Sequence, residues 1–173
     1  MSDLSLSGEE LLAWNDLTAR KWRDFITAHP ALLDVPCDIR EATTAGKLLQ
    51  HIVAVEVRYA QRLVGLPETD FSAVPYGTGD ELLATHFQAM ELIRSVMADP
   101  DYDWSHKIEF VTMTAGKLKA SRKTILVHAL MHSIRHYAQL ATLARQHGFK
   151  PDWQMDYLFM GAERVEHPTA EVA

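Results

Sequence analysis

The amino-acid sequence predicts an all-α protein whose architecture is a four-helix bundle, with a short β-hairpin-like excursion before the last long helix. Four long segments carry apolar residues at three- and four-residue spacing, which is the period of an amphipathic helix. Capping residues, glycine or proline bound these segments, and a β-prone run separates the third from the fourth. A chain of 173 residues can bury its own core, so we expect a single domain over 1–173.

Composition and charge argue against several classes of partner. Hydrophobic residues make up 47% of the chain and the formal net charge is −6, whereas nucleic-acid-binding proteins normally carry a basic patch. No apolar run is long enough to span a membrane, and the N-terminus has no basic-then-apolar leader. We therefore expect a cytoplasmic protein with neither a nucleic-acid nor a membrane partner. The one cysteine, Cys37, excludes an internal disulfide, and we expect it to be a passive small hydrophobe.

The first predicted helix begins after Ser7, a typical N-cap residue that is followed by acidic residues in the first turn. It runs to about Ala28, because the next residues are His29 and Pro30, and proline cannot continue the hydrogen-bond ladder. Its buried face consists of Leu11, Trp14, Leu17, Thr18, Trp22 and Phe25.

The second and third predicted helices are bounded by similar signals. The second starts near Thr44 and ends near Gly65, a glycine stop that Pro67 follows. Its apolar stripe consists of Leu48, Ile52, Val55, Tyr59 and Leu63. Asp80 is expected to cap the third helix, which covers about Glu81 to Ala98.

Residues 102–120 have a different composition, rich in β-prone side chains and interrupted at Ala115-Gly116, which predicts a short two-stranded excursion. The β-prone side chains are Ile108, Phe110, Val111, Met113 and Leu118. The fourth helix is expected from Thr124 to Gly148, and a short helix around Met155 to Phe159 in the tail.

The fourth helix carries histidines where hydrocarbon is expected. At about 100° per residue, its apolar stripe consists of Ile125, Ala129, His132, His136, Leu140 and Leu143. Two unpaired imidazoles on a buried face would cost several kcal/mol of desolvation, so they need a shared partner. Side chains four residues apart are neighbours on a helix and can reach one divalent metal ion.

A third ligand is expected from a facing helix, because His128, His132 and His136 extend over about 12 Å of one helix axis and cannot all reach one ion. His51, on the flank of the second helix's apolar stripe, is the candidate, with His86 of the third helix as the fallback. Three histidines with an open position suit catalytic zinc, and also nickel, iron or copper. His86 is expected on the polar side of the third helix, before Phe87, and has no expected role beyond that of the fallback. No role is expected for the remaining histidines, which lie at helix ends, in loops or on polar faces: His29, His106, His147 and His167.

Three stretches of the sequence resemble the DinB/YfiT-like superfamily of metal-dependent enzymes. The family's last-helix signature has two histidines before a Gln and an Arg-x-x-Gly ending, and the stretch that resembles it is LVHALMHSIRHYAQLATLARQHG. The stretch that resembles the source of the family's first histidine is KLLQHIVAVEVRYAQRLVG. FVTMTAGKLKASRKTILVH resembles the hairpin-like lead into that last helix. The resemblance implies a four-helix bundle, often a homodimer, with a divalent metal, zinc or nickel, on His51, His132 and His136.

Two residues depart from the family pattern. Arg135 stands where many members have another histidine, and Tyr137 replaces a usual arginine. Some relatives are thiol-dependent S-transferases or isomerases that use a small thiol cofactor. If these two residues contact the substrate, the substrate of this protein need not be the common one.

We therefore expect a metal-dependent enzyme that activates water or a thiolate for reaction with a small-molecule substrate, in a hydrolase or thiol-dependent transferase class. The residues expected to orient the ligands or contact the substrate are Arg58, Tyr59, Arg62, His128, Arg135 and Gln139. The alternative is a non-catalytic stress-response or small-molecule-binding bundle with a structural metal, whose coordination would be closed.

The tail bears on the expected homodimer. Trp153, Tyr157, Leu158 and Phe159 follow the fourth helix and are more apolar than a free tail should be. They are expected either to form part of a dimer interface or to fold back over the bundle of their own chain.

Overall fold

The computed structural model describes residues 5–112, 115–163 and 165, and these form four long helices and one two-stranded hairpin. The elements are α1 (Gly8–Ala28), α2 (Ala45–Val64), α3 (Gly79–Met97), β1 (Lys107–Thr112), β2 (Gly116–Ser121) and α4 (Arg122–Gln146). Short 3₁₀ turns lie between or after them at Pro30–Asp34, Ile39–Glu41, Phe71–Ala73 and Tyr157–Met160. The predicted all-α four-helix bundle with a hairpin before the last helix is confirmed.

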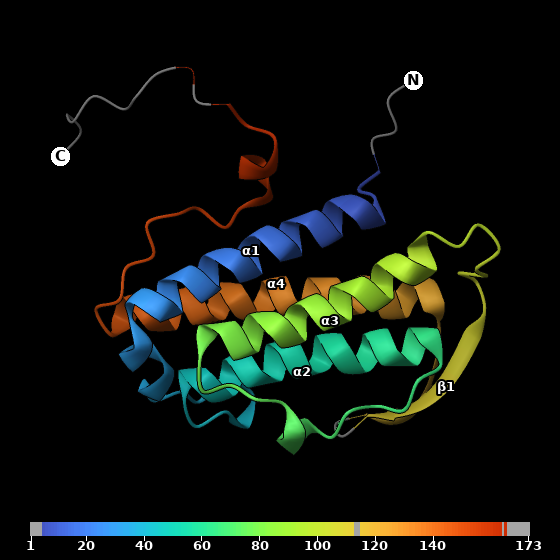
Figure 1. Ribbon diagram of the computed structural model, residues 1–173, viewed down its shortest axis with the longest axis horizontal. Helices are drawn as coiled ribbons and strands as arrows, with labels where there is room; N and C mark the ends of the chain where they lie inside the picture. Colours follow the sequence, from blue (N-terminus) through green and yellow to red (C-terminus); the bar gives the residue numbers. More distant parts are fainter. Residues whose placement is uncertain (1–4, 113–114, 164, 166–173) are drawn as a thin grey trace.

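The four helices pack side by side with a long return connection between the second and the third (Figure 1). Helix α2 packs against α3 and α4, and α1 packs against the same two helices from the other side. Figure 1 shows α2 and α3 running in the same direction, with α1 and α4 running the opposite way. Residues 65–78 therefore travel back along the bundle, which brings Phe71 of this connection alongside α2.

The helix ends follow the predicted capping chemistry, with one correction. Ser7 caps α1 in a reciprocal capping box with Glu10, and Gly65 ends α2 with a φ of 75°, a left-handed conformation that glycine adopts without steric cost. The prediction that Asp80 caps the third helix is wrong. Thr78 is the cap, because its side chain accepts from the backbone N–H of Glu81 while the Glu81 side chain bonds back.

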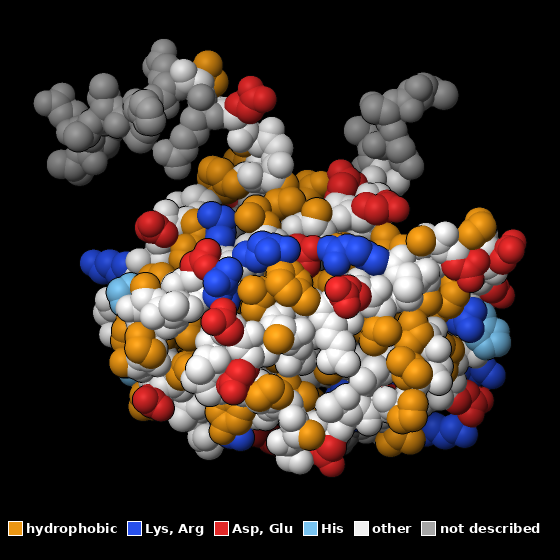
Figure 2. All heavy atoms as spheres, viewed as in Figure 1, with side chains coloured by type: hydrophobic (Ala, Val, Ile, Leu, Met, Phe, Trp, Pro, Cys, Tyr) orange, Lys and Arg blue, Asp and Glu red, His pale blue; other side chains and the backbone are white. Residues whose placement is uncertain are grey.

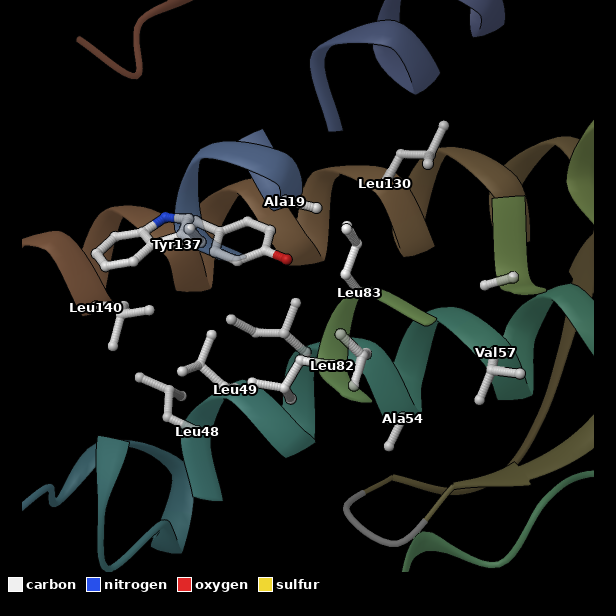
Figure 3. Close-up of a cluster of buried hydrophobic side chains, with 14 of the residues drawn as sticks. Ala19, Leu48, Leu49, Ala54, Val57, Leu82, Leu83, Leu130, Tyr137 and Leu140 are labelled. Carbon is white, nitrogen blue, oxygen red and sulfur yellow. The ribbon is translucent and has the colours of Figure 1, made fainter. Parts of the chain in front are cut away.

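The core lies where the four helices meet (Figure 3). Tyr137 and Leu140 of α4 point toward Leu48 and Leu49 of α2, and these four side chains are at most 2% exposed. Trp22 of α1 stacks on Tyr137 with ring centroids 6.3 Å apart, which links α1 to the same cluster. Burial of this size supplies most of the stabilisation of such a bundle.

The hairpin before α4 packs against the end of α2. β1 and β2 pair antiparallel with Phe110 opposite Leu118, and Phe110 contacts Tyr59 with ring centroids 6.2 Å apart. A two-stranded hairpin is marginal alone, so this contact with the bundle stabilises it. The predicted excursion is confirmed, although Met113 lies outside the described residues.

The tail folds back over its own chain rather than extending away from it. Trp153 packs edge-on against Trp22 at 5.3 Å, and Trp14 Nε1 donates to the backbone carbonyl of Met155 at 2.9 Å. The short helix in the tail is a 3₁₀ turn at Tyr157–Met160, slightly later than predicted. Leu158 and Phe159 are exposed, and the homodimer stays a prediction.

The prediction that His86 lies on the polar side of the third helix is wrong. His86 is fully buried, with Nδ1 2.8 Å from a Glu56 carboxylate oxygen and Nε2 2.8 Å from Asp16. Arg94 also pairs with Asp16. Burial alone would lower the pKa of His86, but the carboxylates of Glu56 and Asp16 outweigh it and raise the pKa to about 9. A charged network therefore joins α1, α2 and α3 inside the bundle.

The outer face over α1 and α3 carries charges of both signs (Figure 2). Lys and Arg side chains gather there with Asp and Glu between them, and Arg23 pairs with Asp24 at 3.1 Å and Asp80 at 3.5 Å. Within the described residues, no helix is both long enough and apolar enough to cross a membrane.

Candidate metal centre

The structure brings together three of the histidines that the sequence singled out. His51 of α2 and His132 and His136 of α4 each offer a ring nitrogen, and these three atoms lie within 4.8 Å of one another. The Nε2 atoms of His51 and His132 are 3.2 Å apart. His128, the competing candidate, stays outside this group, although its ring is 5.6 Å from that of His132.

Helix geometry explains the convergence. His132 and His136 are one turn apart on the face that α4 turns toward α2, so their rings lie 4.4 Å from each other. His51 projects from α2 across this contact, with its ring 5.0 Å from each of the other two. His132 is 8% exposed and His136 is 1% exposed, whereas His51 is half-buried. The group therefore opens toward solvent on the His51 side.

Two neighbours fix the tautomer of His136. Arg135 Nη2 lies 3.1 Å from His136 Nε2, and an arginine can only donate, so Nε2 is the acceptor. Nδ1 then carries the proton and donates to Gln139 Oε1 at 2.7 Å. Nε2 is therefore the unprotonated nitrogen, and its lone pair, which accepts from Arg135 here, is the one that could ligate a metal ion while Gln139 holds the other nitrogen by a hydrogen bond.

All three imidazoles are held in the neutral form that binds metals. Burial and the positive charges of His136, Arg40 and Arg135 lower the pKa of His51 to about 4. Burial also lowers the pKa of His132 to about 2, and the pKa of His136 is lowered by burial and by Arg135. Neutral imidazole is the form that ligates a metal ion, so the three nitrogens are available at neutral pH.

The geometry fits a divalent metal ion. Two nitrogens that share a tetrahedral zinc ion at about 2.0–2.1 Å lie roughly 3.3–3.4 Å apart, close to the 3.2 Å between His51 and His132. The Nδ1 atom of His132 is buried, and within the described residues no protein atom hydrogen-bonds it. Without an ion, the two Nε2 atoms can share one proton in a hydrogen bond between neutral rings, and an ion bound between them would replace that hydrogen bond.

Aromatic side chains line the side of the group that faces the hairpin and the return connection. The Phe71 ring lies 5.7 Å from His51, and the Tyr59 ring lies 5.3 Å from His128. Tyr59 and His128 are among the residues predicted from the sequence, whereas Phe71 is not, because a loop residue carries no periodic signal. Phe71 thus packs against a member of the histidine group, and Tyr59 packs against His128, which lies beside that group.

The predicted residues Arg58 and Arg62 are both paired with Glu68. Arg58 contacts a Glu68 oxygen at 2.7 Å and donates to the Thr69 carbonyl at 2.6 Å, while Arg62 pairs with the other oxygen and lies over the ring of Tyr59. Both arginines thus share one carboxylate, and they hold the start of the return connection against α2.

Arg40 is a residue near the group that the sequence did not reveal. Arg40 and Glu41 lie in a 3₁₀ turn and have φ values of 53° and 63°, which side-chain-bearing residues rarely adopt. The Arg40 charge acts on both His51 and His136. Strained backbone of this kind often occurs at functional sites.

Comparison with known proteins agrees with the resemblance found in the sequence. No curated protein matches the chain. The model of the DinB family matches residues 1–166 of the 173, a range that includes the four helices and all three histidines of the group. The protein therefore belongs to the DinB family.

Proposed function

We propose that the protein is a divalent-metal-dependent enzyme that acts on a small molecule, with His51, His132 and His136 holding the ion. Zinc and nickel are the metals that three neutral imidazoles suit best, because both accept nitrogen ligands and neither needs a thiolate or a carboxylate. When bound, the ion would supply Lewis acidity that lowers the pKa of a coordinated water or thiol, so that either becomes a nucleophile at neutral pH.

The observation that carries this proposal is the open side of the histidine group. Within residues 5–112, 115–163 and 165, no fourth histidine, cysteine or carboxylate joins the three nitrogens. Structural metal sites are usually closed by four protein ligands, whereas catalytic sites keep a position for water or substrate. His51 is half-buried, and the neighbouring Arg135 and Gln139 are exposed, so this open side can be reached from solvent.

The surrounding residues have separate tasks in this proposal. Gln139 holds the proton of His136 on Nδ1 and so keeps Nε2 free for the ion. Phe71 and Tyr59 exclude water from one side, while Arg135 lies at the open edge. No general base is assigned to a protein residue here, because the nucleophile would already be activated at the ion.

The test is whether the ion keeps an exchangeable position. The protein is loaded with one equivalent of cobalt(II), and its visible absorption, which depends on coordination geometry, is followed as 2-mercaptoethanol is added. We expect the spectrum to change saturably, because the thiolate takes the open position. The alternative, a non-catalytic bundle with a closed structural metal, predicts a spectrum that the thiol leaves unchanged. His132→Ala is the control and should take up little cobalt.

A further inference from the structure

We propose that Arg135 and Arg40 bind an oxyanion of the substrate, so that the substrate is a small anionic molecule carrying a carboxylate or a phosphate. This inference rests on the proposed function and adds the chemical class of the substrate to it. It comes from an imbalance of charge around the histidine group, which no carboxylate of the described residues corrects.

Arg135 touches the histidine group without any acidic partner. Its guanidinium donates to His136 Nε2 at 3.1 Å, and that nitrogen would be a ligand of the ion. When the ion is bound, the guanidinium has to leave this nitrogen but stays at the edge of the group, because Arg135 and His136 are adjacent on α4. A guanidinium is always charged, so a positive side chain would then lie beside a dication.

Arg40 approaches the same group from the connection before α2. It is exposed, and its backbone conformation, with a φ of 53°, is one that costs energy for any residue with a side chain. Within the part of the chain that the structure describes, neither Arg40 nor Arg135 forms an ion pair. Arg23, Arg58, Arg62 and Arg94 have acidic partners. Arg20 and Arg122 have none among the described residues either, but each lies over an aromatic ring.

The electrostatics of the site favour an anionic substrate. Three neutral imidazoles, two unpaired arginines and a divalent ion give a strongly positive site, and like charges at a few ångströms repel unless an anion lies between them. A carboxylate or a phosphate matches the planar fork of a guanidinium and can bridge it to a metal ion. A hydroxide or a thiolate offers a single acceptor atom, so it cannot bridge the ion to a guanidinium through two oxygens as a carboxylate or a phosphate can.

A hollow next to the group offers space for the rest of such a molecule. It has a volume of about 370 Å³ and lies between the Arg40 connection and α4, where Asp38, Ile39 and Gln139 line it. Gln139 also accepts the proton of His136, so the hollow and the histidine group share this side chain. Asp38 places one negative charge in the hollow and neither arginine lines it, so we place the oxyanion at the arginines and the uncharged remainder of the molecule in the hollow.

The experiment measures anion binding to the cobalt(II)-loaded protein by visible absorption, with acetate and inorganic phosphate as separate probes. We expect Arg135→Gln to weaken the binding of at least one probe by about tenfold or more, because a charge-assisted hydrogen bond is worth about 1.5–3 kcal/mol. Arg40→Gln should weaken it less, and Arg135→Lys should fall between wild type and Arg135→Gln, since lysine keeps the charge but not the fork. Arg145→Gln, an exposed arginine further along α4, is the matched control and should leave anion binding unchanged.

The outcomes separate the two proposals. Normal cobalt binding with equal anion affinity in wild type and Arg135→Gln overturns this inference alone, as does a wild-type protein that binds neither probe. Failure of the wild-type protein to bind cobalt overturns the proposed function as well. The probe that loses more affinity in Arg135→Gln identifies the oxyanion as a carboxylate or a phosphate.

Discussion

His132→Ala is expected to remove most of the bound metal while leaving the helical fold intact. His132 is a buried member of the histidine group and its Nε2 lies 3.2 Å from that of His51, so the variant loses both a ligand and the chelating pair on α4. Removing only an outer hydrogen-bond partner of a metal ligand typically costs 10–100-fold in affinity, and losing the ligand itself should cost at least about 100-fold. Metal content is measured by mass spectrometry and the fold by far-ultraviolet circular dichroism. A His132→Ala protein with undiminished metal would refute the assignment of this residue.

The pH dependence of metal binding follows from the lowered pKa values. Because the pKa of His51 is about 4 rather than 6.5, the folded protein keeps this nitrogen unprotonated as the pH falls through 6.5. The unfolded chain takes up protons from about pH 6.5 downward, so the metal-free protein should lose stability between pH 6.5 and 4. Metal should therefore stay bound below pH 6.5 wherever the fold persists.

His86→Leu is expected to cause the largest loss of stability among single changes outside the metal centre. The side chain lies between Glu56, which is fully buried, and Asp16. The substitution leaves the Glu56 carboxylate without its partner and Asp16 with Arg94 alone. Breaking a buried ion pair by removing one member costs about 3–5 kcal/mol of the free energy of unfolding. Urea unfolding of the metal-free protein measures the loss, and His147→Gln, an exposed histidine, is the control.

The same variant has a characteristic pH dependence. The pKa of His86 is raised to about 9, above the 6.5 of the unfolded chain, so its stabilising contribution is fully present below pH 6.5 and is lost as the pH rises through about 9. The difference between wild type and His86→Leu should therefore shrink from pH 6.5 to about pH 9.5. Adding Glu56→Gln to His86→Leu should recover part of the loss, because one buried charge is removed. A cost below about 1 kcal/mol at pH 6.5 would contradict the buried network.

Much of the fold could be predicted because its signals are local. The apolar spacing of α1 to α4, the cap at Ser7 and the stop at Gly65 each depend on a few neighbouring residues. The start of α3 was misplaced because Asp80 and Thr78 are both good capping residues, and the choice depends on where the backbone turns.

The histidine group was predictable for a related reason. His132 and His136 interrupt an apolar stripe, and such an interruption is visible without any knowledge of the partner helix. His86 interrupts an apolar stripe in the same way, four residues after Leu82 and four before Met90, and this spacing is typical of a buried position. Its partners Glu56 and Asp16 come from two other helices, so the pairing itself depends on packing that the sequence does not display.

Other features of the site depend on tertiary structure. Phe71 reaches His51 because residues 65–78 return along the bundle, and nothing in a loop sequence fixes that path. The left-handed backbone at Arg40 and Glu41 is equally invisible in the sequence, since neither residue favours it. Arg58 and Arg62, predicted as contacts for the ligands or the substrate, instead share Glu68, which follows them in the return connection, and this pairing depends on the path of that connection.

The central claim is that one ion is held jointly by α2 and α4, and a comparison of His51→Ala with His128→Ala tests it most directly. Both variants are titrated with zinc against a competing chelator. His51 belongs to the group of three nitrogens and His128 does not, although both rings lie close to His132. We predict that His51→Ala weakens zinc binding at least about tenfold and that His128→Ala changes it much less. If His128→Ala is the more damaging substitution, the ion is not shared between α2 and α4 through His51, and the account is wrong.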